Sequence, residues 1–144
     1  ARVPAIGGGN FILLSKNRAS CLSACEIAVN VMSEIGNIIT PFPGGVVRSG
    51  SKVGSKYKAL IASTNDAFCP SLSGITGSKL HKSVNCVMEI VINGLTKEDI
   101  DKGIRESLIA ISKSKYKKDI VSVSAGNYGG KLGPHHFHLR KILK

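Results

Sequence analysis

Residues 86–96 read Cys86-Val87-Met88-Glu89-Ile90-Val91-Ile92-Asn93-Gly94-Leu95-Thr96, and they carry the strongest secondary-structure signals of the chain. Its run of β-branched residues predicts a strand over residues 86–93. Thr96 is then a typical helix N-cap, with Asp99 three positions later as in a capping box. Apolar residues recur beyond it at spacings of four, four and three, which predicts an amphipathic helix through Ile100, Ile104, Leu108 and Ile111. A strand therefore leads directly into a helix.

The same pattern occurs earlier in the chain. Residues 10–14 (NFILL) form a short apolar run that predicts a buried strand. The following residues 19–35 predict a helix that ends at Gly36, with its apolar positions at Leu22, Cys25, Val29 and Met32. Further strands are expected over residues 46–49, 120–124 and, as a short addition, 136–142.

The order of these elements predicts the architecture. It is β-α-β, a long connection, then β-α-β, which favours an α+β sandwich of the ferredoxin-like, split βαβ type. In that fold two helices cover one face of an antiparallel sheet. We expect residues 1–144 to form a single lobe of this kind, with a long functional loop at residues 50–85.

Length and composition exclude several classes of protein. A chain of 144 residues with 42% hydrophobic and 20% charged residues is typical of one globular domain. No apolar run approaches the roughly 20 residues needed to cross a bilayer. The chain begins with Ala rather than Met, so we expect a processed protein or a fragment.

Charge indicates the kind of partner. Twenty Lys and Arg against nine Asp and Glu give a formal net charge of +11, which favours anionic ligands. The basic residues are dispersed, and the chain has only four Phe, three Tyr and no Trp for base stacking. Without a zinc-finger or RNA-binding motif, nucleic acid is not the expected partner.

The cysteines and histidines give no strong metal motif. None of the four cysteines has the C-x-x-C spacing of a zinc knuckle, so we expect reduced, structural thiols and a cytoplasmic protein (Cys21, Cys25, Cys69, Cys86). Cys69 has no readable catalytic partner. His136 and His138 would share one face of a strand beside His135, but no carboxylate or Cys nearby completes a metal site, and no metal is expected.

Two glycine-rich segments are candidate anion cradles. Residues 50–56 (GSKVGSK) offer hydroxyls, lysines and backbone N–H groups, although a solvated basic loop explains the same composition equally well. Residues 126–133 (GNYGGKLG) repeat the theme directly after a strand. Neither segment has the residue order of a nucleotide-binding loop.

Glu89 lies in the middle of the strongest strand. Alternation places it with Val87 and Val91, opposite the face that should pack against the helices. If this face is open, Glu89 is an ordinary exposed carboxylate, which is the interpretation that the strand alone favours. If the face is covered, burial would raise the pKa of Glu89 and suit it to proton transfer.

Five segments together resemble one family, formylmethanofuran:tetrahydromethanopterin formyltransferase. They are residues 40–47 (TPFPGGVV), 51–56 (SKVGSK), 62–70 (ASTNDAFCP), 86–95 (CVMEIVINGL) and 124–133 (SAGNYGGKLG). The family's protein is about twice this length, and the matching part resembles its second, C-terminal lobe. The resemblance implies a missing N-terminal lobe and a cytoplasmic homo-oligomer, either a dimer or a tetramer.

The resemblance also implies the chemistry. A formyl group would move between methanofuran and N5 of tetrahydromethanopterin in a ternary complex, with no prosthetic group or catalytic metal. Both substrates carry carboxylates and the pterin also carries a phosphate. Glu89 matches the family's proton-transferring strand glutamate. The expected substrate-binding residues are Ser51, Lys52, Gly54, Ser55, Lys56, Asn65, Asp66, Asn127, Gly129, Gly130 and Lys131. The alternative is a stand-alone lobe that binds pterin or methanofuran without catalysis.

Overall fold

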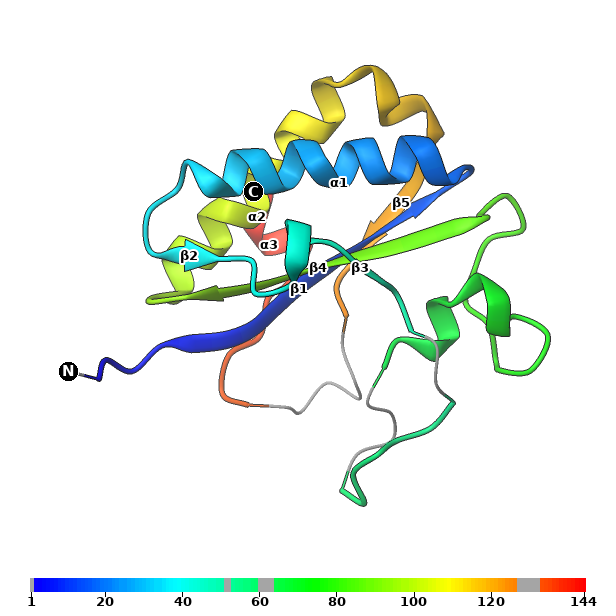
Figure 1. Ribbon diagram of the computed structural model, residues 1–144, viewed down its shortest axis with the longest axis horizontal. Coiled ribbons are helices and arrows are strands. Elements are labelled where there is room, and N and C mark those ends of the chain that lie inside the picture. The colour runs from blue at the N-terminus through cyan, green and yellow to red at the C-terminus, as the bar shows by residue number, and fades with distance from the viewer. Residues whose placement is uncertain (1, 51–52, 60–63, 127–132) are drawn as a thin grey trace.

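The computed structural model describes residues 2–50, 53–59, 64–126 and 133–144. These residues form a mixed α/β structure built on a five-stranded antiparallel sheet in the order β2-β4-β1-β5, with β3 also paired to β4 (Figure 1). The strands are β1 (Ile6–Ser15), β2 (Ile38–Ile39), β3 (Val47–Arg48), β4 (Cys86–Gly94) and β5 (Ile120–Ser124). The helices are α1 (Arg18–Ser33), α2 (Lys97–Lys113) and the short α3 (Leu139–Ile142).

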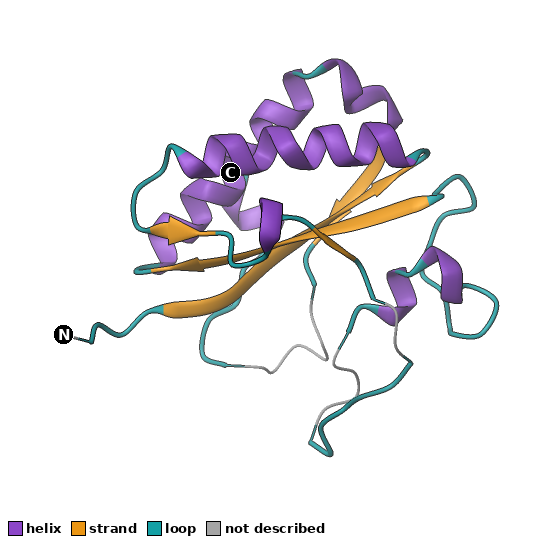
Figure 2. Ribbon diagram, viewed as in Figure 1, coloured by secondary structure: helices purple, strands orange, loops and turns teal. Residues whose placement is uncertain are grey.

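Helices α1 and α2 lie side by side on one face of the sheet (Figures 1 and 2). The main core lies between these layers, and Phe11, Leu13, Ile90 and Ile92 contribute to it from the two central strands. All four side chains are fully buried. This side of the sheet accounts for most of the buried apolar surface and so supplies most of the hydrophobic stabilisation.

The prediction for α2 is confirmed. Thr96 caps the helix, because its hydroxyl accepts a hydrogen bond of 3.1 Å from the backbone N–H of Asp99. The four apolar residues spaced along the predicted stripe are all buried: Ile100, Ile104, Leu108 and Ile111.

The predicted buried face of α1 is partly wrong. Leu22 is 41% exposed, whereas the predicted Cys25 and Met32 are buried together with Ala24 and Ala28. Small residues let α1 approach α2 closely, and Ser107 Oγ of α2 donates to the carbonyl of Ala28 over 3.1 Å. Pattern reasoning favours the largest apolar residue, whereas close helix packing here selects the smallest ones.

Two boundaries differ from the sequence predictions. The helix α1 stops at Ser33, and the residue with left-handed backbone after it is Asn37, with φ of 67°, rather than Gly36. The predicted strand over residues 46–49 is a two-residue bridge, Val47–Arg48. The two-residue strand β2 precedes it, and both pair with β4.

The strand predicted over residues 136–142 is wrong, because the chain forms the helical turn α3 there. Ile142 is 3% exposed and packs into the main core. Its carbonyl accepts a hydrogen bond of 2.6 Å from Nε of Arg105 in α2. Leu139 and Ile142 are three residues apart, a helical spacing that outweighs the alternation seen earlier in the segment.

The opposite face of the sheet has its own, smaller core. Ile12, Leu14 and Val87 are buried there against Phe68 and Leu80 of the long β3–β4 connection. In its described residues this connection contains only two short 3-10 turns, Asp66–Phe68 and Pro70–Leu72. The long connection therefore covers part of the face that the helices leave free. Within the described ranges, no helix is long and apolar enough to cross a membrane.

Candidate functional site

Glu89 is buried on this second face. Only 5% of it is exposed, and its direct cross-strand neighbours are Ile12 on β1 and Val47 on β3. The alternation predicted for β4 is confirmed, because Ile90 and Ile92 pack into the helix-side core while Val87 packs into the smaller one. The carboxylate is therefore covered rather than open to water.

Two amide side chains hold the Glu89 carboxylate. Asn10 Nδ2 of β1 donates to Oε1 over 2.5 Å, and Asn65 Nδ2 of the long connection donates to Oε2 over 3.2 Å. Both asparagines are more than nine-tenths buried. Because each oxygen has its own donor, the carboxylate has a fixed orientation and the cost of burying a polar group is offset.

Glycines allow these side chains to converge. A Cβ atom added to Gly126, just after β5, would lie 2.1 Å from Asn10 Nδ2 and 2.9 Å from Asn65 Nδ2. A Cβ added to Gly50 would lie 2.4 Å from the backbone carbonyl carbon of Asn65. Glycine at 126 leaves room for the amides around Glu89, and glycine at 50 permits the close approach of two loops.

Of the predicted residues in the loops before β4, Gly54 and Asp66 bond to each other, whereas Ser55 bonds within its own loop. The backbone N–H of Gly54 donates to Asp66 Oδ2 over 3.3 Å, and Asp66 Oδ1 accepts from the N–H of Ala67 over 2.9 Å. Asp66 therefore joins the 50s loop to the turn that carries Asn65. Ser55 Oγ donates to the carbonyl of Tyr57 over 2.9 Å, and Lys56 is exposed.

Six of the expected substrate-binding residues lie outside the described residues. They are Ser51, Lys52, Asn127, Gly129, Gly130 and Lys131. Of the other predicted site residues, Asn65 and Glu89 come into contact, whereas Gly54 and Asp66 bond to each other. Sequence reasoning missed Asn10, whose only signal is an amide at the head of an otherwise apolar strand.

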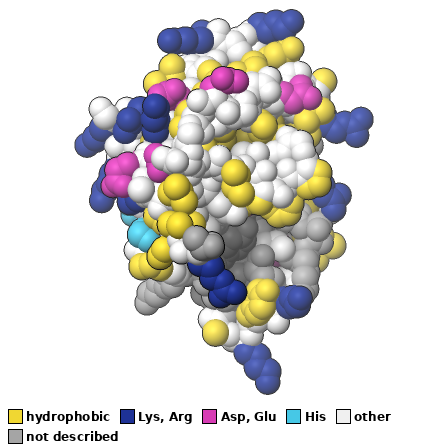
Figure 3. Space-filling model, turned by 60° about the vertical axis from the view of Figure 1, so that its left-hand side comes forward, with side chains coloured by type: hydrophobic (Ala, Val, Ile, Leu, Met, Phe, Trp, Pro, Cys, Tyr) yellow, Lys and Arg dark blue, Asp and Glu magenta, His cyan; other side chains and the backbone are white. Residues whose placement is uncertain are grey.

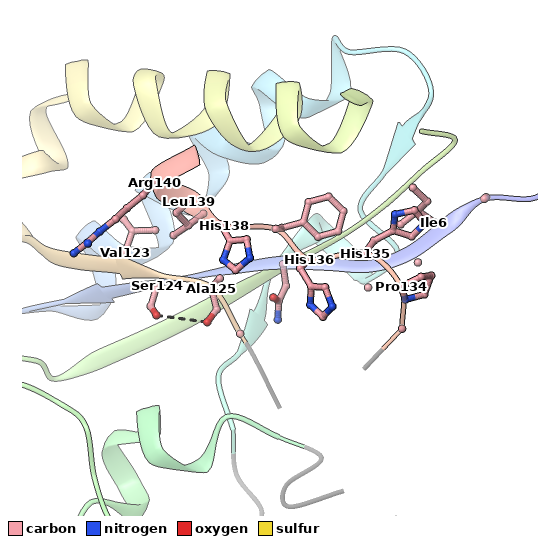
Figure 4. Close-up of a pocket in the computed structure, with 17 residues that line it drawn as sticks. Ile6, Val123, Ser124, Ala125, Pro134, His135, His136, His138, Leu139 and Arg140 are labelled. Atoms are coloured by element: carbon pink, nitrogen blue, oxygen red, sulfur yellow. Dashed lines mark hydrogen bonds between the residues drawn. The ribbon is translucent and has the colours of Figure 1, made fainter. Parts of the chain in front are cut away.

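A pocket of about 770 Å³ lies beside this cluster (Figure 4). Its lining comes from three parts of the chain: residues 5–8 and 10 of β1 and its approach, residues 123–126 at the end of β5, and residues 133–140. Asn10 belongs both to this lining and to the Glu89 cluster. The volume is within the range typical of small-molecule sites.

The charge of the pocket lining favours anions. Its ionisable side chains are those of His135, His136, His138 and Arg140, and none of the lining residues is a carboxylate. On one face of the molecule, Lys and Arg side chains are spread over separate places rather than gathered in one patch (Figure 3). On this face the basic side chains do not form the continuous track that a nucleic acid would follow.

The thiols are structural in character. All four cysteines are free. Burial and the neighbouring Cys21 raise the pKa of the Cys86 thiol to about 12, and a hydrogen bond with Cys25 together with burial raises the pKa of Cys21. Cys69 is 1% exposed, with its sulfur 3.2 Å from Ser71 Oγ. The described part of the chain contains no group of three or more His, Cys, Asp or Glu that could hold a metal ion.

The chain is a mixed α/β protein with an antiparallel sheet, one face of which is covered by α1 and α2. The other face carries a buried carboxylate that two amides bind, beside a pocket suited to anions. These features define a class of small-molecule-binding α/β proteins with a buried acid. Comparison with known proteins then identifies the family. The family model described as "FTR, proximal lobe" matches residues 1–142. The chain belongs to the formylmethanofuran–tetrahydromethanopterin formyltransferase family.

Curated relatives with that name come from bacteria and archaea. The protein from Methylobacillus flagellatus is 58% identical over 141 residues, covering 98% of this chain and 47% of the relative. The protein from Methanocaldococcus jannaschii is 44% identical over 143 residues, covering 96% of this chain and 46% of the relative. The chain thus spans about half the length of the curated relatives it matches.

Two solved structures share the fold. The formyltransferase/hydrolase complex from Methylorubrum extorquens, solved with methylofuran, is 48% identical with a TM-score of 0.84, covering 97% of this chain and 46% of the other. The formyltransferase from Methanosarcina barkeri is 43% identical with a TM-score of 0.81, covering 96% and 46% respectively.

Proposed function

We propose that this chain is one lobe of an enzyme that moves a formyl group between formylmethanofuran and N5 of tetrahydromethanopterin in one-carbon metabolism. The observation that carries this proposal is Glu89, a buried carboxylate with both oxygens fixed by amides beside a pocket free of carboxylates among its lining residues. Relatives of 44% to 58% identity bear the name of this activity.

The reaction needs a group that carries a proton. When N5 attacks the formyl carbon, a new C–N bond forms and the carbonyl oxygen becomes an oxyanion. The nitrogen of methanofuran leaves as the old C–N bond breaks, and the proton lost by N5 must end on that nitrogen. Glu89 accepts the first proton and returns it, so no charge remains on the enzyme. A fixed carboxylate serves this role because the two nitrogens must be reached from one position.

We propose that the flanking loops bind the substrates. Ser51, Lys52, Gly54, Ser55 and Lys56 supply N–H, hydroxyl and ammonium donors to carboxylate or phosphate groups. Asn127, Gly129, Gly130 and Lys131 do the same from the segment after β5, and Asp66 holds the first of these loops in place. Asn65 acts through Glu89, whose orientation it fixes. Donors of this kind also stabilise the oxyanion of the tetrahedral intermediate.

The lobe itself is proposed to be ferredoxin-like and to form the C-terminal half of a longer polypeptide. The sheet order β2-β4-β1-β5, with α1 and α2 on one face, supports the split βαβ assignment. The match to a proximal-lobe model and the 47% coverage of a relative support a second lobe. An intact mass about twice that of this chain, measured for the protein from its source cells, tests this point.

The remaining proposals concern the surroundings of the enzyme. The expected partners are the two anionic carriers and further copies of the chain in a dimer or tetramer. The relative from Methylorubrum extorquens belongs to a formyltransferase/hydrolase complex, which supports association of this family with other subunits. We further propose a cytoplasmic location and catalysis without a prosthetic group.

Glu89→Gln in the complete polypeptide tests the function. Glutamine keeps the shape of the side chain but cannot carry the proton, so formyl transfer should fall by about 10²- to 10⁴-fold. Substrate dissociation constants should stay close to those of the parent protein. Glu98→Gln, a change at an exposed glutamate of α2, is the matched control and should leave the rate intact.

Each other outcome has a distinct meaning. Full activity of the Glu89→Gln variant would remove Glu89 from the mechanism. A parent protein that binds both carriers but transfers nothing would favour a binding lobe without catalysis.

A further inference from the structure

Two imidazole rings face the pocket from one short segment. His136 and His138 project to the same side of the chain after β5, with ring centroids 6.5 Å apart and planes tilted by 31° (Figure 4). Phe137 between them packs against the main core, and Lys97 Nζ lies 5.5 Å from the centre of its ring. The alternation anchors the segment through the phenyl ring and leaves both imidazoles exposed.

The spacing of the rings suits one shared acceptor group. An oxygen that accepts from an imidazole N–H at about 2.9 Å lies about 4 Å from the ring centre. Rings 6.5 Å apart can therefore both donate to the oxygens of a single carboxylate or phosphate placed between them. Imidazole always offers at least one N–H donor, and two when it is protonated.

The surroundings select against cations. Arg140 and His135 are the other ionisable residues of the pocket lining, so no lining carboxylate competes for the imidazole N–H groups. Lys97, which lies over the Phe137 ring, forms an ion pair with Asp101. An anion at the two rings would thus meet N–H donors, and the nearby Glu89 carboxylate is already held by Asn10 and Asn65.

We propose that His136 and His138 form an oxyanion-binding subsite, which holds a carboxylate or phosphate of a substrate in the pocket that Asn10 shares with the Glu89 cluster. This rests on the proposed formyl transfer for the identity of the substrate, but not for the binding of the anion. The pair fixes a charged end of the substrate while Glu89 acts on the reacting nitrogens.

Titration of the complete polypeptide with inorganic phosphate, and separately with glutarate, tests the subsite by NMR of the imidazole C–H signals. The signals of His136 and His138 should shift saturably with at least one anion. His81, which lies in the long β3–β4 connection and pairs with Ser83, is the internal control and should not follow the same curve. Shifts that never saturate, or that His81 shares equally, would overturn the proposal.

Substitutions then assign the shift to the two rings. His136→Ala and His138→Ala should each weaken anion binding by about tenfold or more, because a charge-assisted hydrogen bond is lost. His81→Ala should change nothing, and thermal unfolding should show that each variant folds. Parent-like binding by both pocket variants would be evidence against the subsite.

In the complete polypeptide the same variants should raise the KM of one substrate with little change in kcat. A stronger response to phosphate assigns the subsite to the pterin, and a stronger response to glutarate assigns it to a substrate carboxylate. Saturable anion binding without formyl transfer by the parent protein would leave the subsite standing and remove the proposed function. Formyl transfer by the parent protein without saturable shifts of the His136 and His138 signals would support the proposed function and remove the subsite.

Discussion

Asn10 Nδ2 lies 2.5 Å from Glu89 Oε1, and each of the two side chains is 5% exposed. Their strands are adjacent, but the residues are not direct cross-strand partners, since Asn10 pairs with Val91 and Glu89 with Ile12. The amide reaches diagonally across the sheet to the carboxylate. Such a contact makes the orientation of Glu89 depend on the register between β1 and β4.

Replacing Asn10 by Ala should damage catalysis more than binding. It removes the Asn10 amide donor from Glu89 Oε1 at a buried position, which should cost about 1–3 kcal/mol of stability. We expect kcat to fall by about 10- to 100-fold with KM little changed, measured by steady-state kinetics and urea unfolding. Asn10→Asp should be worse than Asn10→Ala, because it sets a second carboxylate against the first.

A matched control for this change is Asn85→Ala. Asn85 also donates through its side-chain amide, to the backbone carbonyl of Lys16 over 3.0 Å, but it is exposed. Its loss should leave kcat unchanged. Equal kinetic effects of the two substitutions would argue against a positioning role for Asn10.

Gly126→Ala should disturb the same carboxylate from a third direction. The new methyl group would lie 2.1 Å from Asn10 Nδ2, so the amide must leave its place beside Glu89. A displacement of about 1 Å in such a site costs about 10²-fold in rate. Gly74→Ala, where a Cβ meets nothing within 4 Å, is the control and should retain full activity. An unimpaired Gly126→Ala enzyme would show that the amide positions are not critical.

The helix-side core should tolerate little change. Ile104 of α2 is fully buried in the main cluster, so Ile104→Ala should lower the free energy of unfolding by about 2–5 kcal/mol. Ile109→Ala lies on the same helix but at a position that is 41% exposed, and it should cost far less. Urea denaturation of the two variants measures the difference. A similar loss in both would contradict the assigned helix face.

Acid should weaken one contact between α1 and the turn before β5. Ser20 Oγ donates to Asp119 Oδ2 over 2.6 Å, and this hydrogen bond lowers the pKa of Asp119. Because the pKa of Asp119 is lower in the folded protein, its ionised carboxylate stabilises the fold at pH above its unfolded pKa of about 3.9. This stabilisation is lost as the pH falls through the folded-state pKa. Ser20→Ala should therefore lower stability at neutral pH and flatten its decline in acid.

Urea midpoints measured from neutral pH down through the acid range test this prediction. Ser33→Ala removes an exposed serine of the same helix that donates to the carbonyl of Asn30, and it should leave the pH profile unchanged. Parallel profiles for parent and Ser20→Ala protein would mean that Asp119 has no share in acid unfolding.

The sequence predicts best where local chemistry decides the structure. The N-cap Thr96 and the stripe through Ile104 identify α2 because both signals lie within a few residues of one another. The alternation of β4 likewise assigns Glu89 to the face away from the helices. Neither signal states whether that face is covered, because the cover comes from Phe68 and Leu80 in a connection with no periodicity.

The parts that could not be predicted depend on distant contacts. Asn10 is an unremarkable amide at the start of an apolar run until the register of β1 against β4 brings it to Glu89. Leu22 is exposed because the Ala24 and Ala28 side fits against α2, a preference that periodicity alone does not show. Only the resemblance to a known family favoured a buried Glu89 in advance.

The contact between Asn10 and Glu89 joins residues 79 positions apart, and the contact from Asn65 spans 24. Closing chain segments of this length is slow compared with forming a helix. During refolding, helical signal should therefore return before any activity does. Glu89 gains the Asn10 amide only in molecules in which β4 has paired with β1, so its carboxylate is held in one orientation only after the central strands have met.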